Sequence, residues 1–208
     1  MTLRGFEPGK RVALLISECQ RGVVDPSRAM FGTLAAQVEE RQIIPRIARL
    51  ANSFRRAKQP VVHLWVSHRP DYADTPRVST IFGLAIKHKM MISGSTDVEP
   101  VPGLEPQQQD HIQERRFSLC AFNGTDLNTT LRNLRIDTLV LTGVSSNVAI
   151  NSSSIAGSDL GYQIVIPEDC IAGATAESHD FMVHNLLPLY ATLSTQAAVE
   201  AALTGLAA

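Results

Sequence analysis

The chain has 208 residues, of which 44% are hydrophobic and 19% charged, and its formal net charge is −1. These values are typical of a globular protein and exclude a disordered chain. Because positive charge is not in excess and aromatic residues make up only 5%, we expect neither a nucleic acid nor an anionic membrane as a partner. The length predicts one domain covering residues 1–208.

The cellular compartment is predicted from segments that the sequence lacks. Its longest apolar runs are too short to span a bilayer, and the first residues, MTLRGFEPGKRV, have no apolar signal-peptide core. The three cysteines, Cys19, Cys120 and Cys170, are an odd and widely spaced set without a CxxC pair. Such a set is typical of reduced thiols, so we expect a cytoplasmic protein without a disulfide framework.

The first half of the chain alternates between apolar runs and one strongly periodic segment. Val12–Ser17 is short, continuous and rich in Val, Leu and Ile, which predicts a buried strand. Ile43–Lys58 carries apolar residues at helical spacing, with Pro45 suited to its first turn and a possible earlier start near Ala36. We expect a second strand at Pro60–Val66 and one short helix near Ser79–Lys87.

The second half continues the alternation. The predicted strands lie around Ile112 and at 138–142, 163–166 and 191–194, and the predicted helices at 125–134, 146–160, 177–187 and 195–203. Thr125 is the expected cap of the first of these helices, and Gly161 ends the second. Six strands alternating with helices predict an α/β fold, a three-layer α/β/α domain around a doubly wound, mainly parallel, six-stranded sheet.

A ligand crevice in such a sheet lies beyond the carboxyl ends of the strands. Functional residues are therefore expected among the residues at these ends, which are Glu18, Ser67–His68, Arg115–Arg116, Val144–Ser146 and Glu168–Asp169.

Three segments together resemble the isochorismatase-like hydrolase superfamily, a group of cysteine hydrolases. They are LLISECQRGVV (14–24), RRFSLCAFNGTDLNTTLRNLRIDTLVLTGVSSNVAI (115–150) and GYQIVIPEDCIAGAT (161–175). The most specific features are AF-x-GT-x-L, L-x-GV-x-x-N and GYQIVIPEDC, in that order. The resemblance extends from about Lys10 to Ser194 and implies the Rossmann-like fold of that superfamily.

The resemblance implies three catalytic positions: one after the first strand, one after the third strand, and one at the start of the helix that follows GV-x-x-N. The family's usual Asp falls on Glu18, and its Lys falls on Arg115 or Arg116, depending on the direction of counting. The family's nucleophilic Cys falls on Ala149, whose methyl group cannot attack a carbonyl carbon. We therefore expect no thiol-acyl mechanism at that position.

Other nucleophiles near this position have structural interpretations that we favour. Ser146 enters the helix and is expected to be an N-cap. Cys19 is expected to be a small buried thiol, because it points away from Glu18 in an extended segment. Cys120 lies in a loop, where a reactive role stays an open alternative.

The resemblance also implies how the substrate site is built. The Val144–Ser145 peptide is expected to be cis, with oxyanion-hole donors near Asn147–Ala149. The positions implied to bind substrate are Gln20, His68, Phe122, Val144, Ser145, Ser146 and Asn147. His68 lacks the neighbouring ligands of the family's metal-binding members, so we expect no metal and no other cofactor. His63 is expected to pack in the core.

Two functions remain open from the sequence. The first is a hydrolase of a small carbonyl- or carboxylate-bearing metabolite, in which Glu18 transfers the proton and Arg115 or Arg116 binds a carboxylate, as in vinyl-ether hydrolysis. The alternative is an inactive small-molecule-binding or regulatory protein on the same scaffold. The alanine-rich run AAVEAALTGLAA at 197–208 and the resemblance together predict a homodimer or a larger homo-oligomer.

Overall fold

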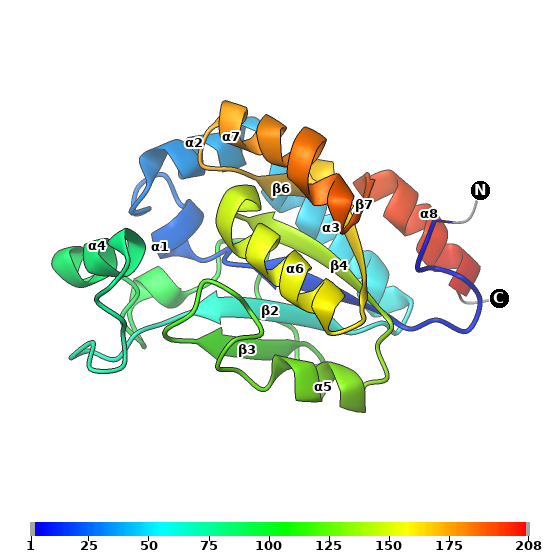
Figure 1. Ribbon diagram of the computed structural model, residues 1–208, viewed down its shortest axis with the longest axis horizontal. Helices are drawn as coiled ribbons and strands as arrows, with labels where there is room; N and C mark the ends of the chain where they lie inside the picture. Colours follow the sequence, from blue (N-terminus) through cyan, green and yellow to red (C-terminus); the bar gives the residue numbers. More distant parts are fainter. Residues whose placement is uncertain (1–2, 207–208) are drawn as a thin grey trace.

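The computed structural model describes residues 3–206 and contains one sheet, all of whose named strand pairs are parallel (Figure 1). The strands are β1 (Val12–Ser17), β2 (Val61–Val66), β3 (His111–Arg115), β4 (Thr138–Val144), β5 (Gln163–Pro167), β6 (Ile171–Ala172) and β7 (Thr192–Ser194). Their order across the sheet is β3-β2-β1-β4-β5-β7, with β6 paired to β4. Because β1 lies in the middle, the chain winds outward in both directions, as predicted.

The sheet has seven strands rather than the predicted six. The additional strand, β6, has two residues that pair with Gly143 and Val144 at the end of β4. A two-residue strand has no periodic pattern of its own, because it exists through its pairing partner. The sequence therefore contained no signal for it.

Helices cover both faces of the sheet and one end of it. The α-helices are α1 (Arg21–Val24), α2 (Gly32–Glu40), α3 (Ile43–Arg56), α4 (Thr80–His88), α5 (Leu127–Asn133), α6 (Asn151–Asp159), α7 (Ala176–Phe181) and α8 (Gln196–Leu206). The predicted helix at 43–58 is a separate helix from α2, because Gln42 between them has left-handed backbone (φ 54°). No helix within residues 3–206 is long and apolar enough to cross a membrane.

Alternating strand residues divide the core between the two faces. In β1, Leu14 and Ile16 pack on the face covered by α3 and α8, with Phe54 and Leu203. Leu15 lies in the core of the other face, which includes residues of α5 such as Leu131. All six residues of β1 are buried, as expected for a strand with helices on both sides. These observations confirm the three-layer α/β/α architecture.

Two predicted helix caps are placed differently. Helix α5 begins at Leu127 with Asp126 as its cap residue, one residue after the predicted Thr125. The Thr125 hydroxyl nevertheless accepts a hydrogen bond from the Leu127 N–H (3.4 Å), and it donates one to the Ala121 carbonyl (2.6 Å). The helix after β4 opens with a π-helical turn, Ser146–Ile150, preceded by Ser145. The hydroxyl of Ser146 has no hydrogen-bond partner within residues 3–206, so the predicted N-cap at Ser146 is wrong.

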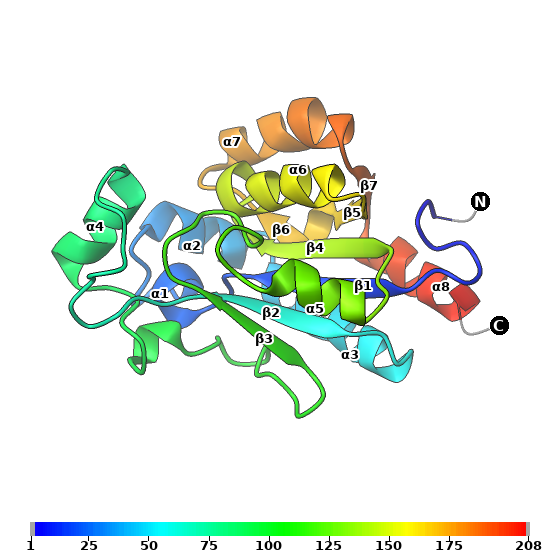
Figure 2. The same cartoon turned by 60° about the horizontal axis from the view of Figure 1, so that its bottom comes forward.

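Helix α4 is the element that brings further residues to the strand ends. Ser79 caps it by accepting a hydrogen bond from the Phe82 N–H, and Lys89 ends it in left-handed conformation. Figure 2 shows α4 standing beyond the arrowheads of β2 and β3, away from the two layers of helices on the sheet. The long segment between β2 and β3 therefore covers the edge at which we predicted the crevice.

Candidate active site

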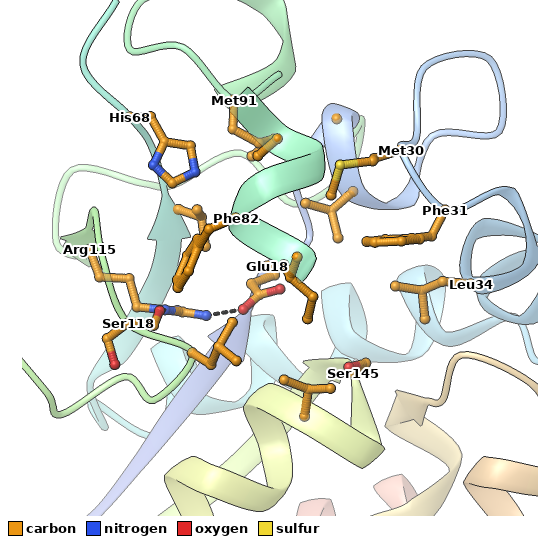
Figure 3. A pocket seen from close by; sticks show the side chains of 17 residues that line it. Glu18, Met30, Phe31, Leu34, His68, Phe82, Met91, Arg115, Ser118 and Ser145 are labelled. Atoms are coloured by element: carbon orange, nitrogen blue, oxygen red, sulfur yellow. Dashed lines mark hydrogen bonds and ion pairs between the residues drawn. The ribbon is translucent and has the colours of Figure 1, made fainter. Parts of the chain in front are cut away.

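A cavity opens beyond the carboxyl ends of the central strands (Figure 3). Residues following or ending four strands line it: Glu18 after β1, Val66 and His68 at β2, Arg115 and Ser118 at β3, and Ser145 and Val148 after β4. Its volume is about 700 Å³, counting the space at its mouth. The floor of the cavity therefore lies beyond the carboxyl ends of the strands, where the crevice was predicted.

Glu18 and Arg115 form an ion pair on that floor. The Glu18 Oε1 accepts a hydrogen bond from the Arg115 Nη2, and the Arg115 Nε donates to the Ser118 carbonyl (2.7 Å). The Arg115 side chain is 3% exposed, whereas 17% of the Glu18 side chain remains accessible. Burial lowers the pKa of Arg115 to about 10, so the guanidinium stays charged at neutral pH.

The structure brings Arg115, and not Arg116, to Glu18. Successive side chains of a strand point to opposite faces, and Arg116 leaves the cavity for the surface. It lies 3.6 Å from Asp74 and 3.8 Å from Glu114, with 42% of its side chain exposed. The sequence left this choice open because counting forward from Asp110 gives Arg115, whereas counting back from Phe122 gives Arg116.

The segment after β4 differs in part from the expectation. The Val144–Ser145 peptide is cis, as the resemblance implied. Of the expected oxyanion-hole donors, the Val148 N–H already donates to the Ser145 carbonyl (3.1 Å). Ser145 and Val148 line the cavity, but the buried Ala149 does not.

Several residues predicted to bind substrate lie outside the cavity wall. Gln20 is fully buried, and its side-chain amide forms hydrogen bonds with the backbone of Val66 and Val98, which ties these two segments together. Phe122 stacks on Tyr162 instead, and the Asn147 Oδ1 accepts a hydrogen bond from the Ala174 N–H (3.1 Å). The predicted substrate contacts of Gln20, Phe122, Val144, Ser146 and Asn147 are therefore not supported by the placement of their side chains.

The residues at the end of β5 also lie away from the cavity. Asp169 forms an ion pair with Arg46 (3.0 Å) and accepts a hydrogen bond from the Gln196 N–H (2.8 Å). The Glu168 carbonyl accepts a hydrogen bond from Arg41 (3.3 Å). These contacts attach α3 and α8 to the sheet. The strand order reverses between β1 and β4, and the end of β5 lies away from the cavity because β5 is one strand farther out.

His68 lies on the cavity wall as a neutral side chain. Its Nδ1 is 3.0 Å from the Arg116 carbonyl oxygen and 3.0 Å from the Thr75 hydroxyl. Because a carbonyl only accepts hydrogen bonds, Nδ1 carries the proton. Burial lowers the pKa of His68, so the imidazole is uncharged at neutral pH. Within residues 3–206, no three His, Cys, Asp or Glu side chains are grouped as metal ligands.

His63, Cys19 and Cys120 lie outside the cavity wall and contact other parts of the protein. His63 is buried, as predicted, and its Nε2 lies 3.3 Å from Asp110, which also binds Arg55. Cys19 is buried in the core, and burial raises the pKa of its thiol to about 12. Cys120 is half-buried, and its Sγ lies 3.7 Å from the Ser152 carbonyl.

The sequence interpretation missed the apolar side chains that enclose the cavity. We call them the apolar wall: Met30, Phe31, Leu34, Ile81, Phe82 and Met91. They come from the start of α2, from α4 and from the loop after α4, and not from strand ends. Figure 3 shows Phe31, Leu34 and Met30 on one side of Glu18, with Phe82 and Met91 on another. The only available signal was the apolar content of Met30–Phe31 and Ile81–Phe82 in an otherwise polar region.

Residues 12–198 match the family model described as the isochorismatase domain, which accounts for most of the chain. The chain belongs to the isochorismatase family. Its relatives in this family include YecD of Escherichia coli O157:H7, 29% identical over 184 residues that cover 86% of this chain and 89% of the relative. A second relative is the ureidoacrylate amidohydrolase RutB of Methylobacterium radiotolerans, 29% identical over 175 residues, or 77% of this chain and 67% of that protein.

The fold of the family is also seen in solved structures. A cysteine hydrolase from Pseudomonas syringae pv. phaseolicola superposes with a TM-score of 0.85 at 22% identity, covering 99% of this chain and 98% of the other. At this identity the similarity establishes the fold alone. The chain is accordingly an isochorismatase-family hydrolase by descent, with amidohydrolases among its relatives.

Proposed function

We propose that the protein hydrolyses a small carbonyl- or carboxylate-bearing metabolite by proton transfer through Glu18, without a cysteine nucleophile. The observation that supports this proposal is the position of the Glu18 carboxylate, which lies on the cavity floor and stays partly accessible beside a buried cation. A carboxylate held in this way is able to exchange a proton with a bound molecule or with water.

The placement of the cysteines supports a mechanism without a thiol. None of Cys19, Cys120 and Cys170 is among the cavity-lining residues of the described chain. Burial strongly disfavours the thiolate of Cys19 and Cys170, and the thiolate is the nucleophilic form. Ala149, at the position that the resemblance assigns to the nucleophile, has no atom able to attack carbon.

In the proposed reaction Glu18 handles the proton and water supplies the oxygen. The ion pair with Arg115 stabilises the ionised carboxylate, which takes a proton from water as the water oxygen bonds to the electrophilic carbon. The bond to the leaving nitrogen or oxygen then breaks, and Glu18 returns the proton to that atom. For a vinyl ether, the protonated Glu18 instead donates its proton to the vinyl carbon. Water adds to the resulting oxocarbenium ion as it returns a proton to Glu18, and the hemiacetal that forms breaks its C–O bond to give a carbonyl compound and an alcohol.

A second candidate function is ligand binding without turnover. The observation that favours it is that the two charged groups of the cavity are engaged with each other, and Arg115 also with the Ser118 carbonyl. An ion pair of this kind is able to serve as a structural element of a binding pocket. The two functions make opposite predictions for a variant that keeps the shape of Glu18 and removes its proton transfer.

The test is a hydrolysis screen followed by the Glu18→Gln variant. Small amides, ureido acids including ureidoacrylate, and vinyl ethers are incubated with the protein, and products are detected by proton NMR. For the substrate found, Glu18→Gln is expected to lower kcat by roughly 10²-fold or more with little change in KM, the usual scale for a positioned acid or base. The control is Glu39→Gln, which changes an exposed carboxylate on α2 and should leave kcat unaltered.

Melting temperatures of the same samples separate chemistry from stability. If Glu18 only balances Arg115, Glu18→Gln leaves a buried cation unpaired and lowers stability by a few kcal/mol, while the folded fraction keeps full activity. That result would overturn the acid–base proposal. Binding of panel members by calorimetry, without turnover of any of them, would also overturn it and support the second candidate.

A further inference from the structure

The charges on the cavity wall cancel. Glu18 and Arg115 are one negative and one positive group in direct contact, and Arg115 is almost fully buried. His68, the remaining titratable group on the wall, is buried, and its Nδ1–H already donates a hydrogen bond to the Arg116 carbonyl (3.0 Å). The other polar side chains, Ser118 and Ser145, are neutral hydroxyls. The cavity therefore presents no free charge to a ligand.

The apolar wall forms much of the remaining surface around this ion pair. Phe82, Met91 and Leu34 are 7%, 4% and 6% exposed, so their side chains are packed in place before any ligand arrives. Phe82 packs edge-on against His68, with ring centroids 6.1 Å apart, which fixes the orientation of both rings. Figure 3 shows the Phe31 ring on the opposite side of Glu18 from Phe82. A ligand that reaches Glu18 is thus in contact with apolar atoms on two sides.

Charge and shape together disfavour a carboxylate ligand. The positive charge of Arg115 is already balanced by Glu18, and its side chain is only 3% exposed, so a second carboxylate finds no uncompensated cation. A second carboxylate would also lie near the carboxylate of Glu18 and would lose part of its hydration among apolar side chains, where an unpaired charge is costly. A neutral ligand incurs neither cost, and an apolar body gains free energy by leaving water.

We infer that the cavity selects a neutral molecule with an alkyl or aryl body and one carbonyl group, and that the apolar wall determines this specificity. The inference rests on the proposed function and narrows its substrate from a carbonyl- or carboxylate-bearing metabolite to a neutral carbonyl compound. In this arrangement the body packs between Phe31 and Phe82, and the carbonyl group faces Glu18. The specificity-determining residues therefore come from α2 and α4 and not from the strand ends.

The test compares three probes by isothermal titration calorimetry at neutral pH. Benzamide has an aryl body and a neutral carbonyl, benzoate has the same ring with a carboxylate, and acetamide has the same amide without the ring. We expect benzamide to bind at least tenfold more tightly than either of the others. Benzoate binding as tightly as benzamide would overturn the claim of neutrality. Equal binding of acetamide and benzamide would overturn the role of the apolar wall.

Two variants assign the preference to the apolar wall. Phe31→Lys places a cation at the wall and should shift the benzoate-to-benzamide affinity ratio at least tenfold toward benzoate. The matched control, Val78→Lys, adds the same charge at a residue that is 95% exposed and should leave the ratio unchanged. Phe82→Ala should weaken benzamide at least tenfold and leave acetamide unchanged. An unaltered ratio in folded Phe31→Lys, together with unaltered benzamide binding in folded Phe82→Ala, would overturn the inference.

Failure of this inference is distinguishable from failure of the proposed function, because the probes are scored by binding and not by turnover. A benzamide preference that depends on Phe31, in a protein with no turnover, would overturn the proposed function and support the inference. Turnover that depends on Glu18 and is confined to carboxylates, with benzoate the tightest probe, would support the function and overturn the inference.

Discussion

Glu18 and Cys19 are neighbours whose side chains have opposite surroundings. Glu18 has left-handed backbone (φ 52°), a conformation that costs a non-glycine residue on the order of 1–2 kcal/mol. Its N–H donates to the Leu64 carbonyl at the end of β2, which holds this conformation in place. As a result the Glu18 carboxylate faces the cavity while the Cys19 thiol lies in the core. The backbone conformation of Glu18 therefore directs the proposed catalytic carboxylate to the cavity and the neighbouring thiol to the core.

The surroundings of the cysteines predict the result of thiol labelling. Iodoacetamide should label only Cys120 in the native protein, because Cys120 is half-buried whereas Cys19 and Cys170 are buried. Activity on the substrate found in the screen should persist after labelling, since no cysteine lines the cavity within residues 3–206. Peptide mass spectrometry with an activity assay measures both. Stoichiometric labelling of Cys19 or Cys120 that abolishes activity would contradict this prediction and indicate a relocated thiol.

The burial of His179 predicts that the folded protein loses stability in mild acid. It is 2% exposed, its Nδ1 has no partner among residues 3–206, and burial with nearby Arg41 lowers its pKa to about 4. Because the folded-state pKa lies below the unfolded value of about 6.5, the unfolded chain binds the proton first. Stability is therefore complete above pH 6.5 and falls as the pH drops toward 4, by up to about 3 kcal/mol.

Urea unfolding at several pH values measures this dependence. His179→Gln removes the titrating group and should flatten the fall in unfolding free energy between pH 6.5 and 4, although burial of His63 and His68 lowers their pKa as well and leaves a remainder. His88→Gln alters an exposed histidine on α4 and is the control with an unchanged slope. The same slope in His179→Gln and in the native protein would count against this account.

At the scale of elements, β4 contacts β1 most closely at Gly143. This residue is paired with Ser17, has a positive φ of 96°, and is followed by Val144 and the cis peptide. A Cβ atom at this position would overlap the Ser17 carbonyl oxygen. Glycine is thus required both for the backbone angle and for the approach of the two strands. The position sets the distance between the segments that carry Glu18 and Ser145.

Two glycine substitutions separate these requirements. Gly9→Ala changes a glycine with a similar φ of 86° in open space, and should lower stability by about 1 kcal/mol, the cost of the angle alone. Gly143→Ala adds the overlap with Ser17 and should lower stability by roughly 3 kcal/mol or more. Chemical denaturation of both variants measures the difference. Equal losses would show that the two strands separate freely at this point.

At the scale of the whole molecule, the predicted homo-oligomer depends on the surface of α8. Val199 and Leu203 of this helix face the core, while Ala197, Ala198 and Ala201 are exposed and form a surface of small side chains. Close packing of a second copy on such a surface is sterically possible, and homo-oligomers are common among soluble proteins. The last two residues of the alanine-rich run, 207 and 208, lie outside the described residues.

Light scattering at micromolar concentration tests the oligomeric state. The monomer mass is 22.6 kDa, and we expect at least twice this value. Ala201→Arg should reduce the mass toward that of the monomer, because a long charged side chain keeps the two surfaces apart. Ala36→Arg makes the same change on the exposed face of α2 and is the control. A mass of about 23 kDa for the native protein would contradict the prediction.

Much of the fold was predictable from the sequence because the signals are local. The apolar run of β1 and the periodic pattern of α3 each report burial within one element, and both elements formed where predicted. The alternation of strands and helices then leads to a parallel sheet with a defined edge for ligands. That rule predicts Glu18, His68 and Arg115 at this edge of the sheet, and all three line the cavity.

The tertiary structure alone decided which of these residues meet and what surrounds them. Arg115 faces Glu18 and Arg116 faces solvent because of the register of β3 beside β2, which no spacing within the 115–116 segment specifies. Phe31 and Phe82 meet at the cavity because the long connections fold over the strand ends. Contacts between distant segments depend on how whole elements pack, and a pattern read along one element contains no information about its partners. The sequence by itself therefore determined the layers of the fold and the edge that carries the site, while packing between distant segments determined the ion pair and the apolar wall.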